Sequence, residues 1–300
     1  METVGFIGLG KMGAAIAGNI REAGYPMVVH DVREAATRPL LEAGARQARS
    51  PAEVAAAVDV VFTSLPMPRD VEGVVLGAEG VLEGIKEGAI YLDLSTCGPD
   101  LVRRLEPMFQ QKGARLMDTP VLSTPDRAAN RDLIVMAGGR REDFERVHSL
   151  LDTFADKVVY TGGLGTALIY KLVNNMTSFV MGQVLAEGLT LGIKAGVDLA
   201  VLMETGARGP LGMRNELYSQ SVFRGQFQPP IFTLGLSLKD VGLATELGRE
   251  SGVPMPVANF VEQILRHCVN KGWAEDDFNK AFLWQEEAAG VEVRSSSAGE

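Results

Sequence analysis

Short apolar runs alternate with amphipathic stretches along the first half of the chain. Runs rich in β-branched and aromatic residues predict buried strands at Val4–Gly8, Met27–His30, Val58–Ser64, Ala89–Leu94, Arg115–Met117 and Leu133–Ala137. Helical spacing predicts helices at Met12–Ala23, Ala35–Ala43, Pro51–Ala57, Arg69–Leu76 and Pro99–Lys112. Because strands that alternate with helices form right-handed parallel units, the first half is predicted to be a doubly wound parallel sheet, an α/β fold.

The pattern changes after the glycine-rich stretch 161–165. A long helix is predicted at Leu168–Ala195, and shorter helices follow at Leu199–Glu204, Leu238–Glu250, Val257–Lys271 and Asp277–Ala289. We therefore expect a sheet domain at residues 1–163 and an all-helical domain at residues 164–290. The last ten residues, 291–300, are polar and serine-rich, and we expect them to be a disordered tail.

Composition and charge narrow the functional classes. A net charge of −9 disfavours nucleic acid and anionic membranes as partners, since both would repel an acidic protein. Cys97 and Cys268 are the only cysteines, so we expect neither a disulfide framework nor a zinc site. Apolar runs are interrupted by charges or glycines before 18 residues, which predicts no membrane span. Without a recognisable signal peptide, the expected location is the cytoplasm.

A glycine motif sits between the first strand and the first helix. The run is Gly8-Leu9-Gly10-Lys11-Met12-Gly13, a GxGxxG in the context that dinucleotide binding requires. Gly8 allows a tight turn, Gly10 lets a pyrophosphate approach the backbone, and Gly13 lets the helix pack on the sheet. The helix N-terminus supplies N–H groups and partial positive charge. This context predicts a Rossmann domain that binds NAD or NADP.

The residues after the second strand bear on the choice of cofactor. Asp31 can accept hydrogen bonds from the adenosine ribose hydroxyls and would repel a 2′-phosphate, which favours NAD. Arg33 could pair with that phosphate instead, so NADP remains possible.

Several motifs together resemble the 3-hydroxyacid dehydrogenase family, which includes 3-hydroxyisobutyrate dehydrogenase and tartronate semialdehyde reductase. The matching segments are the run from Gly5 to Gly13, Leu65-Pro66, Asp93-Leu94-Ser95-Thr96, Gly162 to Asn175 and Ser237-Leu238-Lys239-Asp240. The resemblance spans nearly the whole chain. It implies a Rossmann domain followed by an all-α domain, and hydride transfer between NAD(P) and a small 3-hydroxy acid or its semialdehyde.

The resemblance also implies roles for single residues. Leu65 and Pro66 would pack near the adenine and ribose, and Thr96 would lie near the nicotinamide. Lys239 would lie near cofactor and substrate, although an exposed ion pair with Asp240 is the alternative.

The start of the long helix carries the candidate for proton transfer. Lys171 follows the glycine-rich stretch, and Asn174 and Asn175 are three and four residues further on, so all three share a helix face. An ammonium and two amides can hold a small oxygen-rich substrate. We interpret Lys171 as the general acid and base, and the resemblance implies that Asn175 binds substrate; a solvated surface lysine is the alternative.

One segment departs from the family. Where members usually carry a serine and two glycines that bind the substrate carboxylate, this chain has Leu122, Ser123 and Thr124. Two downstream glycine positions are Arg127 and Arg131. Ser123 and Thr124 can still donate to an acid group, so we expect conserved chemistry with altered substrate recognition. Alternatively, Leu122 is only a packing change.

Other residues and functions carry less weight. Arg208 and Arg214 could contact an anion but are more often solvated or interfacial. His30, His148 and His267 lie in no site motif and are interpreted as structural or surface residues. An imine reductase of the same architecture, or a non-catalytic interaction module, remains an alternative; Lys171 argues against both. The long apolar helix favours a homodimer or tetramer.

Overall fold

The computed structural model describes residues 1–295, and the last five residues of the predicted tail, 296–300, lie outside the described residues. The chain forms two compact units, of which the first is Met1–Leu172 and the second begins at Val173. The division falls inside the long helix α9 (Thr166–Lys194), because the first turns of this helix belong to the sheet unit. Leu168, for example, is fully buried in one of that unit's hydrophobic cores.

The first unit is built on one twisted sheet. Its strands are β1 (Val4–Ile7), β2 (Met27–His30), β3 (Arg46–Gln47), β4 (Val60–Thr63), β5 (Ile90–Asp93), β6 (Arg115–Asp118), β7 (Val121–Leu122), β8 (Ile134–Gly138) and β9 (Lys157–Gly162). The strand order is β3-β2-β1-β4-β5-β6-β8-β7, with β9 paired to β8. The chain reverses direction across the sheet between β1 and β4, and dinucleotides bind at this kind of switch point.

The predicted doubly wound sheet is confirmed and is mainly parallel, but the expectation of parallel pairing fails at β8. β8 runs antiparallel to both β6 and β7, whereas β9 is parallel to β8. β7 has only two residues, too few for a period-2 pattern to register in the sequence. The segment that carries Leu122–Thr124 thus forms a short excursion at the edge of the parallel sheet.

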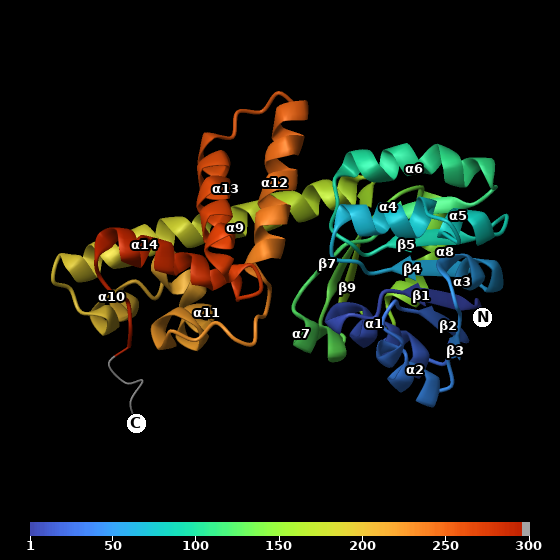
Figure 1. Ribbon diagram of the computed structural model, residues 1–300, viewed down its shortest axis with the longest axis horizontal. Coiled ribbons are helices and arrows are strands. Elements are labelled where there is room, and N and C mark those ends of the chain that lie inside the picture. The colour runs from blue at the N-terminus through green and yellow to red at the C-terminus, as the bar shows by residue number, and fades with distance from the viewer. Residues whose placement is uncertain (296–300) are drawn as a thin grey trace. The chain divides into compact units, whose positions relative to one another are not determined.

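Helices cover both faces of the sheet (Figure 1). They are α1 (Lys11–Glu22), α2 (Arg38–Glu42), α3 (Pro51–Ala57), α4 (Pro68–Leu76), α5 (Val81–Gly84), α6 (Pro99–Gln111), α7 (Pro125–Ala129) and α8 (Arg141–Leu151). The predicted helix 35–43 is instead a 3₁₀ turn, Glu34–Ala36, followed by α2. Alternate residues of the strands face opposite layers, so the unit has two cores.

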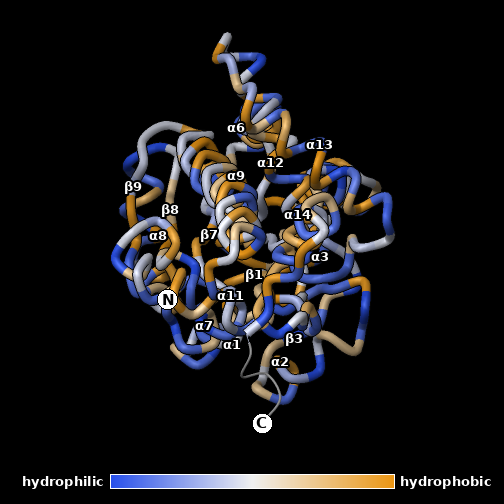
Figure 2. The backbone as a smooth tube through the Cα atoms, turned by 90° about the vertical axis from the view of Figure 1, so that its left-hand side faces the viewer, coloured by the Kyte–Doolittle hydropathy of each residue, from blue (hydrophilic) through white to orange (hydrophobic). Residues whose placement is uncertain are grey.

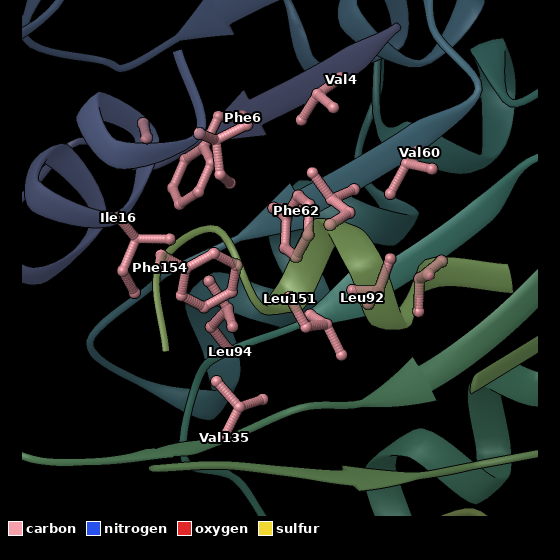
Figure 3. Packing of buried hydrophobic residues seen from close by; sticks show 14 of the residues in the cluster. Val4, Phe6, Ile16, Val60, Phe62, Leu92, Leu94, Val135, Leu151 and Phe154 are labelled. Atoms are coloured by element: carbon pink, nitrogen blue, oxygen red, sulfur yellow. The ribbon is translucent and has the colours of Figure 1, made fainter. Parts of the chain in front are cut away.

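The core beneath α1 and α8 is centred on aromatic rings. Phe6 of β1 stacks on Phe62 of β4 with ring centroids 5.7 Å apart, and Phe154 meets Phe62 edge-on. Ile16 of α1 and Leu151 of α8 close this cluster (Figure 3). All five side chains are fully buried. This packing fixes the end of β1, from which the glycine turn leads into α1, and the end of β4, whose following residue Ser64 lies next to Gly8.

The second unit is helical. Besides the remainder of α9, its helices are α10 (Leu199–Thr205), α11 (Asn215–Gln220), α12 (Leu234–Glu250), α13 (Pro256–Cys268) and α14 (Phe282–Ala289), with 3₁₀ turns at Pro210–Arg214, Val222–Arg224 and Phe278–Ala281 and a π-helical turn at Val269–Trp273. The predicted helix 277–289 therefore begins as a 3₁₀ turn.

The start of the predicted tail is ordered, which corrects the expectation for residues 291–295. Val293 is fully buried in a core of the helical unit, and its backbone N–H donates to the Glu286 carboxylate at 2.8 Å. Arg294 pairs with the same carboxylate. Only one apolar side chain and one ion pair hold this segment, and the sequence of such a segment looks the same as that of a disordered polar tail.

Helix α9 is apolar on most sides, and Figure 2 shows hydrophobic residues on successive turns. Contrary to the expectation from its glycines and charges, this 29-residue helix is long and apolar enough to cross a membrane by length and composition alone. That criterion is also met by core helices of globular proteins. Three polar side chains of α9, Asn175, Gln183 and Thr190, are buried within the protein.

Candidate functional site

The glycine turn has the geometry that its three glycines predict. Gly8 adopts φ +91°, and a Cβ there would lie 2.4 Å from the carbonyl oxygen of Ser64. A Cβ on Gly13 would lie 2.1 Å from the carbonyl oxygen of Gly8. A Cβ on Gly10, by contrast, would meet nothing within 4 Å. The first and third glycines are required by packing, whereas Gly10 leaves open space above the turn.

That open space adjoins the N-terminus of α1. Gly10 is the N-cap residue and supplies no side-chain acceptor, so the first N–H groups of the helix are available to an external anion. Leu9 is buried beneath the turn, and Met12 is partly buried against the same core. The turn therefore fits the pyrophosphate of a dinucleotide.

Asp31 lies beside this turn, at the end of β2. Its Oδ2 accepts the N–H of Leu9 at 2.6 Å, and its Oδ1 accepts the N–H of Arg33 at 2.8 Å. Burial opposes ionisation, but these hydrogen bonds outweigh it and hold the pKa of Asp31 below its usual value. Asp31 therefore fastens the glycine turn, and its carboxylate keeps lone pairs for ribose hydroxyls.

A chain of hydrogen bonds links the loops after β4 and β5. The fully buried Asp93 accepts the N–H of Ser95 at 2.9 Å, and Ser95 Oγ accepts the N–H of Leu65 at 2.9 Å. Burial raises the pKa of Asp93. Pro66 is exposed and Thr96 is half-buried, so both are accessible to a ligand in this loop region. The sequence placed Asp93 within a motif but gave no sign of this structural role.

Lys171 lies in the second turn of α9, where its amine reaches the segment after β6. Nζ donates to the carbonyl oxygen of Val121 at 2.7 Å. Val121 directly precedes Leu122, Ser123 and Thr124, the residues predicted to bind substrate. The structure thus brings the candidate acid–base group to the candidate substrate-binding segment within the first unit.

Asp118 fastens the start of the same helix, a role that sequence reasoning missed. Its Oδ1 accepts the N–H of Gly165 at 2.7 Å and its Oδ2 accepts the N–H of Leu168 at 2.9 Å. The contacts join residues 47 and 50 positions apart, so no local pattern announces them. The one feature in the sequence that could have suggested this role is an aspartate at the end of a predicted buried strand.

The predicted substrate-binding segment is only partly available. Ser123 Oγ donates to the carbonyl oxygen of Asp132 at 2.8 Å, so its hydroxyl proton is engaged within the protein. Leu122 and Thr124 are half-buried, and Thr124 is the N-cap residue of α7 without using its hydroxyl as a cap. Thr124 is therefore better placed than Ser123 to donate a hydrogen bond to substrate.

In the second unit, Asn175 belongs to a buried polar network. Its Nδ2 donates to Asp240 Oδ2 at 2.6 Å, and its Oδ1 accepts from Asn174 Nδ2 at 3.2 Å. Lys239 Nζ lies 3.1 Å from Asp240 Oδ1. The Lys239 side chain is only 9% exposed, so the alternative of an exposed ion pair is wrong. Asp240 fixes the Asn175 amide one helical turn after Lys171.

Comparisons with known proteins agree with these features. Residues 3–162 match the model of the NAD binding domain of 6-phosphogluconate dehydrogenase, and residues 165–284 match the NAD-binding model of NADP-dependent 3-hydroxyisobutyrate dehydrogenase. Mouse mitochondrial 3-hydroxyisobutyrate dehydrogenase is 32% identical, over 95% of this chain and 87% of the relative. The chain belongs to the 3-hydroxyacid dehydrogenase family.

Two further relatives sharpen the comparison. Escherichia coli 3-sulfolactaldehyde reductase is 30% identical, over 98% of this chain and 99% of the relative. The structure of Mycobacterium tuberculosis 3-hydroxyisobutyrate dehydrogenase with L-serine superposes with a TM-score of 0.86 at 26% identity, covering 95% of this chain and 99% of that one. This 3-hydroxyacid dehydrogenase is therefore an NAD(P)-dependent oxidoreductase that transfers a hydride between the cofactor and a small hydroxy acid or its oxidised carbonyl form.

The residues that the sequence left in doubt have structural contacts in this enzyme. Arg214 is buried, and its guanidinium donates to the carbonyl oxygen and the hydroxyl of Ser178. It also lies over the ring of Phe278. Arg214 is therefore packed inside the helical unit and is not a solvated surface residue. Burial lowers the pKa of Arg214. Arg208 is exposed. Among residues 1–295, no cluster of histidine, cysteine and acidic side chains is arranged to hold a metal.

Among the contacts described for residues 1–295, none joins one of the three histidine side chains to a candidate site residue. His30 Nδ1 lies 3.1 Å from the carbonyl oxygen of Ala48, and His148 pairs with Asp152 on the surface. His267 is exposed on α13. These placements agree with the interpretation of all three as structural or surface residues.

Proposed function

We propose that this 3-hydroxyacid dehydrogenase interconverts a small 3-hydroxy acid and its semialdehyde, with Lys171 as the general acid and base. The hydrogen bond from Lys171 Nζ to Val121 carries the proposal, because it places the amine beside the segment Leu122–Thr124. An ammonium carries three N–H donors, and the one that meets Val121 fixes where the amine lies along this segment.

The proposed chemistry divides between cofactor and protein. NAD(P), when bound, accepts or supplies the hydride. In oxidation, Lys171 takes the proton of the substrate hydroxyl; in reduction, it gives a proton to the carbonyl oxygen. Asn175, one helical turn further along α9, binds substrate through the N–H of its amide that Asp240 does not use. The polar network around Asn175 keeps this amide in one orientation.

The proposed substrate carries a small acid group whose recognition differs from that in typical family members. Leu122 stands where the family has a serine, and Ser123 donates its proton to Asp132. Thr124 therefore supplies the side-chain hydroxyl for the acid group, and Asn174, which donates to Asn175, is proposed as a further substrate ligand. The E. coli relative is named for a sulfonated aldehyde, so a sulfonate belongs among the acids to be tested.

We propose NAD as the preferred cofactor. The support is Asp31, whose two oxygens lie beside the glycine turn with a lowered pKa and would repel a 2′-phosphate. Arg33, whose side chain is 65% exposed, already pairs with Asp31, which reduces its value as a phosphate ligand. Lys239 is proposed to contact the cofactor on the strength of the family resemblance alone.

A homo-oligomer is proposed on the basis of α9. Val184 is 57% exposed and Leu191 is 71% exposed, and the two residues lie two turns apart on the same face of this helix, where a second copy of the chain would cover them. We also propose a reducing location such as the cytoplasm, because both cysteines are buried thiols. An acidic chain with a small-molecule site is not expected to bind nucleic acid.

A substrate panel tests the proposed function. Small 3-hydroxy acids, a hydroxy sulfonate and the matching semialdehydes would be assayed with NAD(H) and with NADP(H), reading absorbance of the reduced cofactor. We expect turnover of at least one acid, with kcat/KM at least tenfold higher for NAD than for NADP. A cyclic imine serves as the comparison substrate. Turnover of the imine without turnover of any acid would contradict the proposal and favour an imine reductase, and cofactor binding without any turnover would favour a non-catalytic module.

A further inference from the structure

Two contacts from one short segment reach the first turns of α9. Asp118, the last residue of β6, accepts the N–H groups of Gly165 and Leu168 at 2.7 and 2.9 Å. Three residues later, the carbonyl oxygen of Val121 accepts Lys171 Nζ at 2.7 Å. Leu168 and Lys171 are themselves three residues apart, so they lie on one side of the helix. The backbone of the helix and the amine of its lysine are therefore held from the same segment.

The surroundings are built to admit this carboxylate. Asp118 is fully buried, and a Cβ on Gly138 of the adjacent strand β8 would lie 2.4 Å from its Oδ1. Only a glycine at position 138 leaves the carboxylate room to face α9. The N-terminal N–H groups of a helix need acceptors, and a carboxylate also interacts favourably with the partial positive charge there. Asp118 satisfies both requirements from another element of the fold.

We propose that Asp118 is a positioning residue, which fixes the N-terminus of α9 so that the Lys171 amine meets the Val121 carbonyl and the reacting oxygen. The proposal rests on the proposed acid–base role of Lys171. In the proposed arrangement, Asp118 itself touches neither substrate nor cofactor. Its effect reaches the reaction through the helix, whose first turns have no freedom to rotate or slide while both N–H groups are held. Small displacements of an acid–base group are costly, because proton transfer requires hydrogen-bond distance.

Three ionisable side chains from the neighbouring elements approach Asp118 or the backbone that it holds: Asp93, Arg103 and Lys171. Asp93 is its neighbour in register on β5, Arg103 of α6 approaches Gly165, and Lys171 extends from α9 to Val121. Burial raises the pKa of Asp118 to about 6, against the opposing effect of the N–H groups of Gly165 and Leu168. The carboxylate is thus ionised at neutral pH and accepts a proton within an accessible range.

The test compares Asp118→Asn with Asp143→Asn in the full chain. The asparagine introduced by Asp118→Asn would keep one carbonyl acceptor but would turn an amide NH₂ toward the second helix N–H. Asp143 is the matched control because it is also a buried aspartate of the sheet unit, with a pKa raised by burial, but it makes no hydrogen bond to α9. We expect kcat of Asp118→Asn to fall at least tenfold with KM for the cofactor within twofold of wild type. Asp143→Asn should keep its kcat within twofold.

The pH profile in the reductive direction separates positioning from a merely structural role. Reduction requires the protonated amine, so loss of Lys171 function appears at high pH, and a fall in kcat below about pH 6 reports Asp118. We expect this acid limb in wild type and in Asp143→Asn, and its disappearance in Asp118→Asn. A kcat for Asp118→Asn within twofold of wild type, or an unchanged acid limb, would overturn the proposal.

Two further measurements keep the outcomes distinct. If Asp118→Asn does not fold, the backbone amide shift of Leu168 in the wild-type enzyme decides: a titration near pH 6 supports the proposal and a flat profile overturns it. Lys171→Met is assayed in parallel. An inactive Lys171→Met beside a normal Asp118→Asn refutes the positioning role alone, whereas an active Lys171→Met refutes the acid–base role on which it rests.

Discussion

Three buried aspartates hold the loops of the candidate site in the same way. Asp31, Asp93 and Asp118 end β2, β5 and β6 or follow them directly, and each accepts backbone N–H groups from a loop or helix. Carboxylates buried for this purpose accept strong hydrogen bonds but cost solvation. The balance differs among them: the pKa of Asp31 is lowered, whereas burial raises the pKa of Asp93 and of Asp118.

Asp118 gives the enzyme a pH-dependent stability of defined sign. Its pKa rises from 3.8 to about 6 on folding, so the folded state binds the proton more tightly than the unfolded state. The contribution is fully present below about pH 4 and is lost as the pH rises through about 6. About two pKa units correspond to ~3 kcal/mol.

Urea unfolding between about pH 4 and pH 7 measures this contribution. Other carboxylates titrate in the same range, so the quantity to compare is the difference between wild type and Asp118→Asn. We expect the wild-type enzyme to lose roughly 2–3 kcal/mol relative to the variant as the pH rises from about 4 to 7. Parallel curves for the two proteins would contradict the raised pKa.

The backbone of Arg131 is strained, and the only hint of this in the sequence is that the residue stands at a position where the family has a glycine. It occupies a family glycine position and adopts φ +60°, a left-handed conformation that costs a side chain about 1–2 kcal/mol. Its ion pair with Glu22 is exposed and adds little. We expect Arg131→Gly to stabilise the enzyme by roughly 0.5 kcal/mol, after the greater backbone entropy of glycine in the unfolded chain is subtracted.

The neighbouring residue provides the control for this prediction. Asn130 has φ −95°, where glycine brings only an entropic penalty and the loss of a hydrogen bond to Asp126. Asn130→Gly should therefore destabilise the enzyme by about 1 kcal/mol. Thermal unfolding of both variants measures the two effects, and equal signs would show that the conformation at residue 131 carries no strain.

Among the elements, most of those with a strong period were predicted from the sequence, whereas several short ones without a period, and also β9 and α8, were missed. The long helix α9 and the strands β1, β2, β4 and β5 are found close to their predicted bounds. β3 and β7 have two residues each, and α5 has four, too few for either periodicity to appear. α8 has eleven residues with a clear apolar face, and its omission was an error of interpretation.

The exposed apolar face of helix α9 leads to a prediction about oligomerisation. Val184 and Leu191 are already exposed in the single chain, so replacing them by aspartate costs little monomer stability but places charge in the proposed interface. We expect Val184→Asp/Leu191→Asp to be monomeric by light scattering at micromolar concentration, with unchanged far-UV circular dichroism. Glu187→Gln on the same exposed face is the control and should keep the wild-type mass. A monomeric wild-type protein would remove the proposal.

For the whole molecule, composition and motifs predicted the two-part architecture, the cofactor class and the family. The antiparallel β8 and the buried Val293 were not predictable, because both depend on contacts with distant residues. The glycine turn and Lys171 could be located from the sequence because each belongs to a motif of residues that are close together in the chain. Asp118 and the Asp240 network could not, since hydrogen bonds across 47 to 65 residues leave no local pattern.

The central claim is that the Lys171 amine moves the proton while the glycine turn holds the cofactor. Lys171→Met would be tested by titrating NADH fluorescence and by measuring turnover of the best acid from the panel. Cofactor affinity should stay within twofold of wild type, because the glycine turn is intact, while kcat falls by about 10²–10⁴-fold. A variant that binds NADH and retains kcat within threefold of wild type would contradict the account.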